Sequence, residues 1–142
     1  MEDLIVRMVA RLGVNLIQVY GLYIIIYGHL SPGGGFAGGT IFAASLYLYV
    51  LAFGLGEEQR KIPPSVARVL ESAGALWFVA FGVMAMLAGG AFLANAQGGF
   101  PLGTPGRLTS GGAVFFLLFG IGIKVASTMI TLFNHILEEE AE

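Results

Sequence analysis

The chain has 142 residues, of which 56% are hydrophobic and 11% charged, with a formal net charge of −2, no cysteine and a mean hydropathy of +0.82. Soluble domains carry about 25% charged residues, so this composition indicates an integral membrane protein without room for a separate soluble domain. The lack of cysteine excludes disulfides, zinc–thiolate sites and iron–sulfur clusters within the chain, and the small net charge gives no indication of nucleic-acid binding.

Four apolar stretches are each long enough to cross a bilayer, which takes about 20 helical residues. We expect an all-α protein whose single membrane domain, residues 1–142, is a small bundle of four transmembrane helices. The expected spans cover residues 9–28, 38–56, 72–96 and 109–137. The first stretch lacks a small-residue cleavage pattern, so we interpret it as a retained span and not as a signal peptide.

Polar side chains in the first span have two expected roles. Tyr20, Tyr23 and Tyr27 share one face near its end, which suits the headgroup region of a bilayer. Asn15 and Gln18 lie deeper, three residues apart on one face. Because an uncompensated amide is costly in hydrocarbon, we expect both to hydrogen-bond to a neighbouring helix.

A glycine-rich break at residues 31–39, with the sequence SPGGGFAGG, separates the first two spans. Proline and glycine disfavour a helix interior, so we expect a turn throughout this stretch. A phosphate-binding loop is excluded because the Lys-Ser/Thr pair of that motif is absent. The turn either lets two spans approach closely, or its amides face an ion or a partner subunit.

The connections predict the topology of the chain. Residues 57–71 are charged and contain two prolines, so we expect a solvated loop, and residues 97–110 form a second glycine-rich turn. Both glycine-rich turns together contain one basic residue, Arg107, whereas the amino terminus and the middle loop contain five: Arg7, Arg11, Arg60, Lys61 and Arg68. The positive-inside rule therefore predicts that both termini are cytoplasmic.

Lys124 is a charge within the fourth span, about 20 Å from its expected start at 1.5 Å per residue. A charge at mid-bilayer costs at least about 2.5 kcal/mol, which makes it a functional candidate. Four polar side chains share its helix face: Ser127, Thr128, Thr131 and His135.

Three interpretations of Lys124 remain open at this point. It lines a hydrated path for protons or sodium ions together with Thr128, Thr131 and His135; it pairs with an acid or carbonyl and only fixes helix packing; or it extends toward the lipid surface. We find no aspartate or glutamate within an expected span, so any acid that neutralises Lys124 is expected from another polypeptide. His29, beside the first turn, is expected to be an interfacial hydrogen-bonding group.

Two motifs resemble the B subunit of Mrp-type multisubunit sodium/proton antiporters, the MnhB-related family. The first runs from Gly28 to Gly39, and the second comprises the GTPG sequence at 103–106, Leu108, the SGG sequence at 110–112 and the GIKV sequence at 122–125. In this resemblance Lys124 matches the family's intramembrane lysine. The matching turn residues are His29, Pro32, Gly33, Gly34, Gly35, Phe36, Gly38 and Gly39. Ala37 and Arg107 depart from the family pattern.

The resemblance implies a four-helix subunit of a hetero-oligomer that exchanges Na+ and H+ across a prokaryotic cytoplasmic membrane. The expected partners are other Mrp-type membrane subunits and the lipid bilayer. The same subunit type also occurs in the ion-pumping arm of respiratory complexes, either hydrogenases or sulfur reductases, and a purely structural assembly role is a further alternative. We expect no catalytic residues, metal site or cofactor, because the chain offers no nucleophile–base pair, metal-ligand cluster or cofactor loop.

Overall fold

The computed structural model describes residues 2–141, whose regular elements are all helices; these residues contain no strand. Four helices are long and apolar enough to cross a membrane, as expected. They are α1 (Glu2–Ile26), α2 (Gly35–Phe53), α4 (Pro64–Leu87) and α5 (Ala113–Ala141). Three short elements occur in the connections: α3 (Leu55–Lys61) and the 3-10 helices η1 (Ala96–Gly98) and η2 (Leu108–Gly111).

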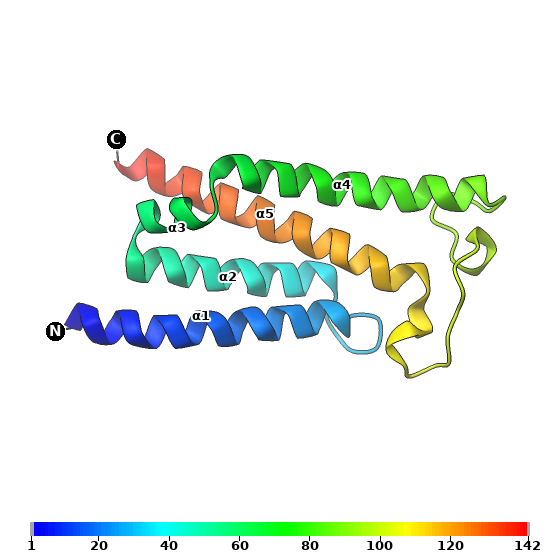
Figure 1. Cartoon of the computed structure of the whole chain (residues 1–142), viewed down its shortest axis with the longest axis horizontal. Coiled ribbons are helices and arrows are strands. Elements are labelled where there is room, and N and C mark those ends of the chain that lie inside the picture. The colour runs from blue at the N-terminus through cyan, green and yellow to red at the C-terminus, as the bar shows by residue number, and fades with distance from the viewer. Residues whose placement is uncertain (1, 142) are drawn as a thin grey trace.

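The four long helices lie side by side in the spatial order α1, α2, α5, α4 (Figure 1). They form an open layer with α1 and α4 at its two edges. The sequence had instead predicted a small bundle. Both termini lie with α3 at one end of the layer, and the turn after α1 and the long connection before α5 lie at the other (Figure 1). The two termini therefore lie at the same end of the helices, and their location on the cytoplasmic side of a membrane stays a prediction from the basic residues.

The expected glycine turn is shorter than residues 31–39. Gly33 and Gly34 have φ angles of 132° and 131°, which disfavour any residue with a side chain, and α2 begins directly afterwards at Gly35. The prediction that residues 35–39 belong to the turn is therefore wrong. Their glycines are helical because close packing against neighbouring helices outweighs their low helix propensity.

The charged segment 57–71 is not a loop. It contains most of α3 and the first two turns of α4, which begins with Pro64 at a position where a helix needs no backbone donor. The prediction of a loop in this segment is therefore wrong. The same prediction placed Glu71 outside the spans, whereas this residue lies within α4. Helix α4 ends at Leu87, nine residues before the expected bound, and α5 begins at Ala113.

Few large side chains are buried inside the chain. A small cluster joins α2, α4 and α5 through Leu46, Ala67 and Ile130, and partly buried aromatic rings such as Phe42 and Phe133 pack around it. Many large apolar side chains of the edge helices are instead more than half exposed, including Leu12, Leu16, Val19, Val69 and Leu76. Surfaces of this kind are suited to contact with lipid or with other membrane subunits.

Candidate ion-path site

Lys124 on one apolar helix forms an ion pair with Glu71 on its neighbour. The Nζ atom of Lys124 on α5 lies 3.3 Å from Oε1 of Glu71 on α4, and the Thr128 hydroxyl donates to the same oxygen at 2.9 Å. Both charged side chains are between one third and one half exposed, so the pair lies at the surface of the isolated chain. The expectation that the neutralising acid comes from another polypeptide is therefore wrong, because Glu71 supplies it.

Close packing of α4 and α5 brings the pair together. Gly74 lies one turn after Glu71, and a Cβ atom at this position would come within 2.7 Å of the Gly120 carbonyl and 2.8 Å of the Lys124 Cβ atom. Any larger residue would thus push the helices apart. The indole Nε1 of Trp77 also donates to the Phe116 carbonyl at 3.0 Å, which fixes the register of the two helices.

The polar face expected on α5 does not form one continuous path within the chain. The hydroxyls of Ser127 and Thr131 donate back to carbonyls of their own helix, those of Ile123 and Ser127. His135 is largely exposed, and its Nδ1 lies 3.9 Å from Oε2 of Glu138 near the end of α5. The structure thus brings Lys124 and Thr128 together around Glu71, whereas Thr131 and His135 lie apart from this site.

The glycines of the turn motif place α2 between its two neighbours. A Cβ atom at Gly38 would approach Gly21 and Ile25 of α1, whereas Cβ atoms at Gly35 and Gly39 would approach backbone carbonyls of α5. The motif therefore packs three helices closely, which was one of its two expected uses. Phe36, between these glycines, points outward and is 63% exposed.

His29 lies under the connection that precedes α5. Its ring packs edge-on against Phe115, with centroids 5.7 Å apart, and both ring nitrogens are shielded without a hydrogen-bond partner within residues 2–141. The expected role as an interfacial hydrogen-bonding group has no support from this geometry. Buried nitrogens of this kind are rare, since an unmade hydrogen bond is costly.

Asn95 anchors the same connection and was not identified from the sequence. Its Nδ2 donates to the Gly111 carbonyl, and its Oδ1 accepts from the Ala113 backbone N–H, both at 2.9 Å. It thereby caps the first turn of α5 from 18 residues away. Local sequence patterns reveal caps beside the helix, so this distant one gave no signal.

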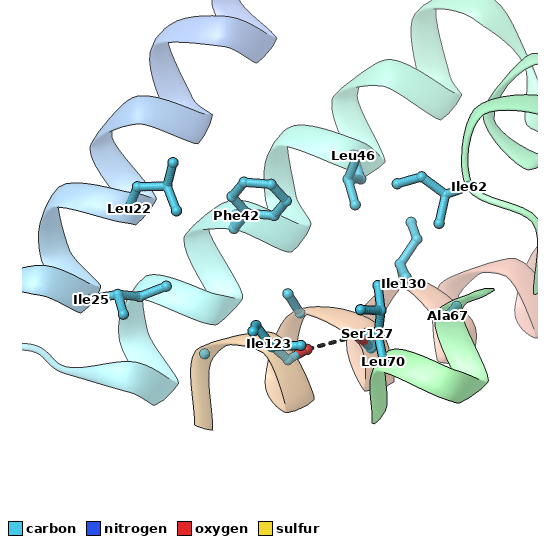
Figure 2. Close-up of a pocket in the computed structure, with 12 residues that line it drawn as sticks. Leu22, Ile25, Phe42, Leu46, Ile62, Ala67, Leu70, Ile123, Ser127 and Ile130 are labelled. Atoms are coloured by element: carbon cyan, nitrogen blue, oxygen red, sulfur yellow. Dashed lines mark hydrogen bonds between the residues drawn. The ribbon is translucent and has the colours of Figure 1, made fainter. Parts of the chain in front are cut away.

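Two of the cavities formed by residues 2–141 lie beside polar side chains considered above. Figure 2 shows the first, an apolar cavity of about 240 Å³ between α1, α2, α4 and α5, where the Ser127 hydroxyl is turned back to its own helix. The second is polar, has a volume of about 590 Å³ and lies at the end of the layer that contains α3. Asn15 and Gln18 line this polar cavity. The sequence analysis had predicted that both would hydrogen-bond to a neighbouring helix.

Within residues 2–141 no group of three or more His, Asp or Glu side chains could hold a metal ion. The fold and the site thus define a multi-pass helical membrane protein with a charged pair between two of its spans. The chain belongs to the family described as the domain related to the MnhB subunit of Na+/H+ antiporter, which matches residues 5–131. This assignment confirms the resemblance expected from the two glycine-rich motifs.

Individual relatives agree with the family assignment. The chain is 33% identical over 139 residues to the B-type subunit of the Na+/H+ antiporter of Bacillus subtilis, covering 98% of this chain and 96% of that protein. An uncharacterized protein of Methanocaldococcus jannaschii is 33% identical over 119 residues, which are 82% of this chain and 45% of that protein.

A solved structure also matches the fold. A chain of the membrane-bound sulfane sulfur reductase, an archaeal respiratory membrane complex, is 34% identical and superimposes with a TM-score of 0.80. The match covers 94% of this chain and 57% of that chain, so the present sequence spans little more than half the length of its structural relative.

Proposed function

We propose that this chain is the B subunit of an Mrp-type multisubunit sodium/proton antiporter module and contributes to both ion translocation and assembly. Membership of the family over residues 5–131 supports the proposal, as does the relative that it matches over nearly the full length of both proteins. The chain acts as a non-catalytic subunit without a cofactor, in the cytoplasmic membrane of a prokaryote. Its partners are other antiporter subunits and lipid, and the transported ions are Na+ and H+.

The pair formed by Glu71 and Lys124, with the Thr128 hydroxyl, carries the ion-translocation part of the proposal. Charged side chains within transmembrane segments are costly and commonly mark ion or proton pathways. The two charges are partly exposed on the chain's surface, so a neighbouring subunit can complete a polar path alongside them. In this path Lys124 and Glu71 provide opposite charges, and Thr128 orients the carboxylate. Thr131 and His135 extend the path only if side chains of another subunit bridge the gap.

The ion-pumping arm of a respiratory complex is a second candidate setting for the subunit. The structural match to a chain of the sulfane sulfur reductase complex favours this alternative. Purifying the tagged chain from its native membrane in mild detergent and identifying every co-purifying polypeptide separates the two settings. Antiporter-like and small helical subunits alone indicate an antiporter, whereas iron–sulfur or nickel–iron subunits indicate a respiratory complex.

A purely structural role is the remaining alternative, in which the glycines and the charged pair only hold neighbours together. The substitution Lys124→Ala in the assembled complex tests it against the ion path. We expect an intact complex whose sodium/proton exchange in vesicles is abolished or strongly reduced, and Thr128→Val should cause a smaller loss. Arg68→Ala is the matched control, because Arg68 is an exposed cation on α4 outside the pair.

The outcomes separate the alternatives. Normal exchange by an intact Lys124→Ala complex contradicts the ion-path role. Loss of partner subunits from the Lys124→Ala complex, with the Arg68→Ala complex intact, supports the structural role instead.

A further inference from the structure

Glu58 is a buried carboxyl that the proposed ion path does not use. It lies on the short helix α3, only 1% exposed, and its Oε2 accepts a hydrogen bond of 3.1 Å from the Asn134 Nδ2 on α5. The other carboxyl oxygen, Oε1, and the Asn134 Oδ1 are both shielded and have no hydrogen-bond partner within residues 2–141. Burying a carboxylate with an unsatisfied oxygen costs more free energy than burying the neutral, protonated carboxyl.

The charged groups around Glu58 do not neutralise it. Neither of the two ion pairs formed by residues 2–141 involves this residue. Arg11 on α1 lies 5.8 Å from the Phe53 ring centroid, and Lys61 on α3 lies 4.2 Å from that of Tyr49 on α2. Other titratable groups on the helices that contact Glu58 include Glu57 on α3 and, near the end of α5, His135 and Glu138. The Glu138 carboxylate accepts a hydrogen bond from Gln59, the residue after Glu58.

The polar cavity of about 590 Å³ connects Glu58 with these basic groups. It is lined by Glu58 itself and by polar side chains of α1 and α3, including Arg11, Asn15, Gln18, Glu57 and Lys61. Burial raises the pKa of Glu58 above its ordinary value of 4.5, and the hydrogen bond from Asn134 offsets part of this rise. A carboxyl with a raised pKa beside a polar cavity is typical of groups that take up and release protons.

We propose that Glu58 is a proton-exchange site that opens onto this polar cavity, at the end of the helix layer where both termini lie. One proton moves between the Glu58 carboxyl and solvent entering the cavity, and no other bond changes. A proton fits better than a metal cation, because a hard cation prefers about six oxygen ligands and two basic side chains line the same cavity. The link between this site and ion exchange rests on the function proposed above.

Infrared titration of the full-length chain in lipid nanodiscs tests the site itself. We expect a carbonyl band of a protonated carboxyl that persists above pH 4.5 and disappears reversibly as the pH rises further. The band should be absent from Glu58→Gln and retained in Glu139→Gln, an exposed acid on α5 outside the cavity. Asn134→Leu should shift the midpoint to higher pH, because Asn134 stabilises the ionised form.

Three results would overturn the proposal. Glu58 could prove fully ionised just above pH 4.5, or its band could persist unchanged through the whole pH range in which the protein is folded, as for a permanently neutral carboxyl. A band that Na+ removes at constant pH would assign the site to sodium instead.

Transport by the assembled complex is the second measurement. We expect Glu58→Gln to reduce the exchange rate several-fold and to flatten its dependence on pH, with Glu139→Gln, an exposed acid on α5, as the control. Unchanged transport by Glu58→Gln would exclude a role in exchange. If the wild-type complex itself does not exchange ions, the proposed function fails, while the infrared titration still decides whether Glu58 exchanges protons.

Discussion

The Nζ atom of Lys124 lies 3.3 Å from Oε1 of Glu71, a residue 53 positions earlier on the neighbouring helix. Because the Thr128 hydroxyl donates to the same oxygen, one carboxylate oxygen receives both donors. The two helices that carry these residues are therefore coupled within the apolar part of the chain, and substitutions at the two ends of the pair should not act independently.

A double-mutant cycle measures this coupling. Lys124→Met and Glu71→Met should each destabilise the folded chain in mixed micelles, because each leaves an unpaired charge among apolar helices. The double mutant should lose less than the sum, with a coupling of about 1–2 kcal/mol, the range for polar contacts within membranes. Additive losses would show that the pair contributes nothing to folding stability.

Gly74 should be intolerant of larger residues. A Cβ atom there would lie 2.7 Å from the Gly120 carbonyl, so Gly74→Val should lower the free energy of unfolding by about 1–3 kcal/mol through overpacking. Gly56→Val is the matched control, because no atom lies within 4 Å of a Cβ added at that position. Unfolding of both variants under identical detergent conditions compares them, and equal stability of the two would contradict the close packing of α4 and α5.

Removing the distant cap of α5 should loosen the start of that helix. Asn95→Ala loses two hydrogen bonds of 2.9 Å and should cost about 1–2 kcal/mol. Faster hydrogen exchange at the Ala113 amide is the direct measurement. Asn95→Asp should lose less protection, because its carboxylate still accepts from that amide and is favourable at a helix start. Equal protection in wild type and Asn95→Ala would exclude the capping role.

His29 should be replaceable by phenylalanine without loss of stability. Both imidazole nitrogens are shielded and unpartnered in the described chain, while the ring packs against Phe115. His29→Phe keeps an aromatic contact and removes the unmade hydrogen bonds, so stability should stay equal or rise by about 1 kcal/mol. Thermal unfolding is the measurement. A clear fall in stability would mean that the nitrogens are hydrogen-bonded in the folded protein, through a group supplied from outside residues 2–141.

The stability of the chain should fall as the pH rises above 4.5 because of Glu58. Its pKa is raised above 4.5 by burial in the folded state. Below 4.5 both folded and unfolded states are protonated, and the contribution of the neutral carboxyl is fully present. Between 4.5 and the folded pKa only the folded state keeps the proton, so stability decreases with pH. Unfolding at several pH values should show this slope in wild type and lose it in Glu58→Gln; an opposite slope would contradict the burial.

The number and nature of the spans could be predicted because apolar length and glycine punctuation are local properties of a sequence. The same local reasoning assigned residues 57–71 to a loop, since segments with several charges and prolines usually lie outside the membrane. The structure contradicts this assignment, because the second half of the segment forms the first two turns of α4. Glu71 is accommodated there because Lys124 and Thr128 of α5 contact its carboxylate. A contact between residues 53 positions apart leaves no periodic signal, so the acid of the candidate site could not be identified.

Close approach of helices was one of the two expected uses of the glycine motif, but residues 35–39 of the motif were placed in the wrong secondary structure. Helix propensity counts each glycine as unfavourable, whereas the neighbouring backbones of α1 and α5 leave no room for larger residues at Gly38 and Gly39. Tertiary packing decided the conformation. Glu58 was missed for a similar reason, because only the arrangement of α1, α2, α3 and α5 buries a side chain from a charged segment.

The spatial order α1, α2, α5, α4 differs from the order in which the helices are synthesised (Figure 1). Helix α4 is therefore synthesised before α5, its main packing partner. Glu71 precedes its partner Lys124 by 53 residues. The last helix lies between α2 and α4 and completes the layer. The Glu71–Lys124 pair can therefore form only after α5 has been synthesised, so it cannot guide the insertion of α4.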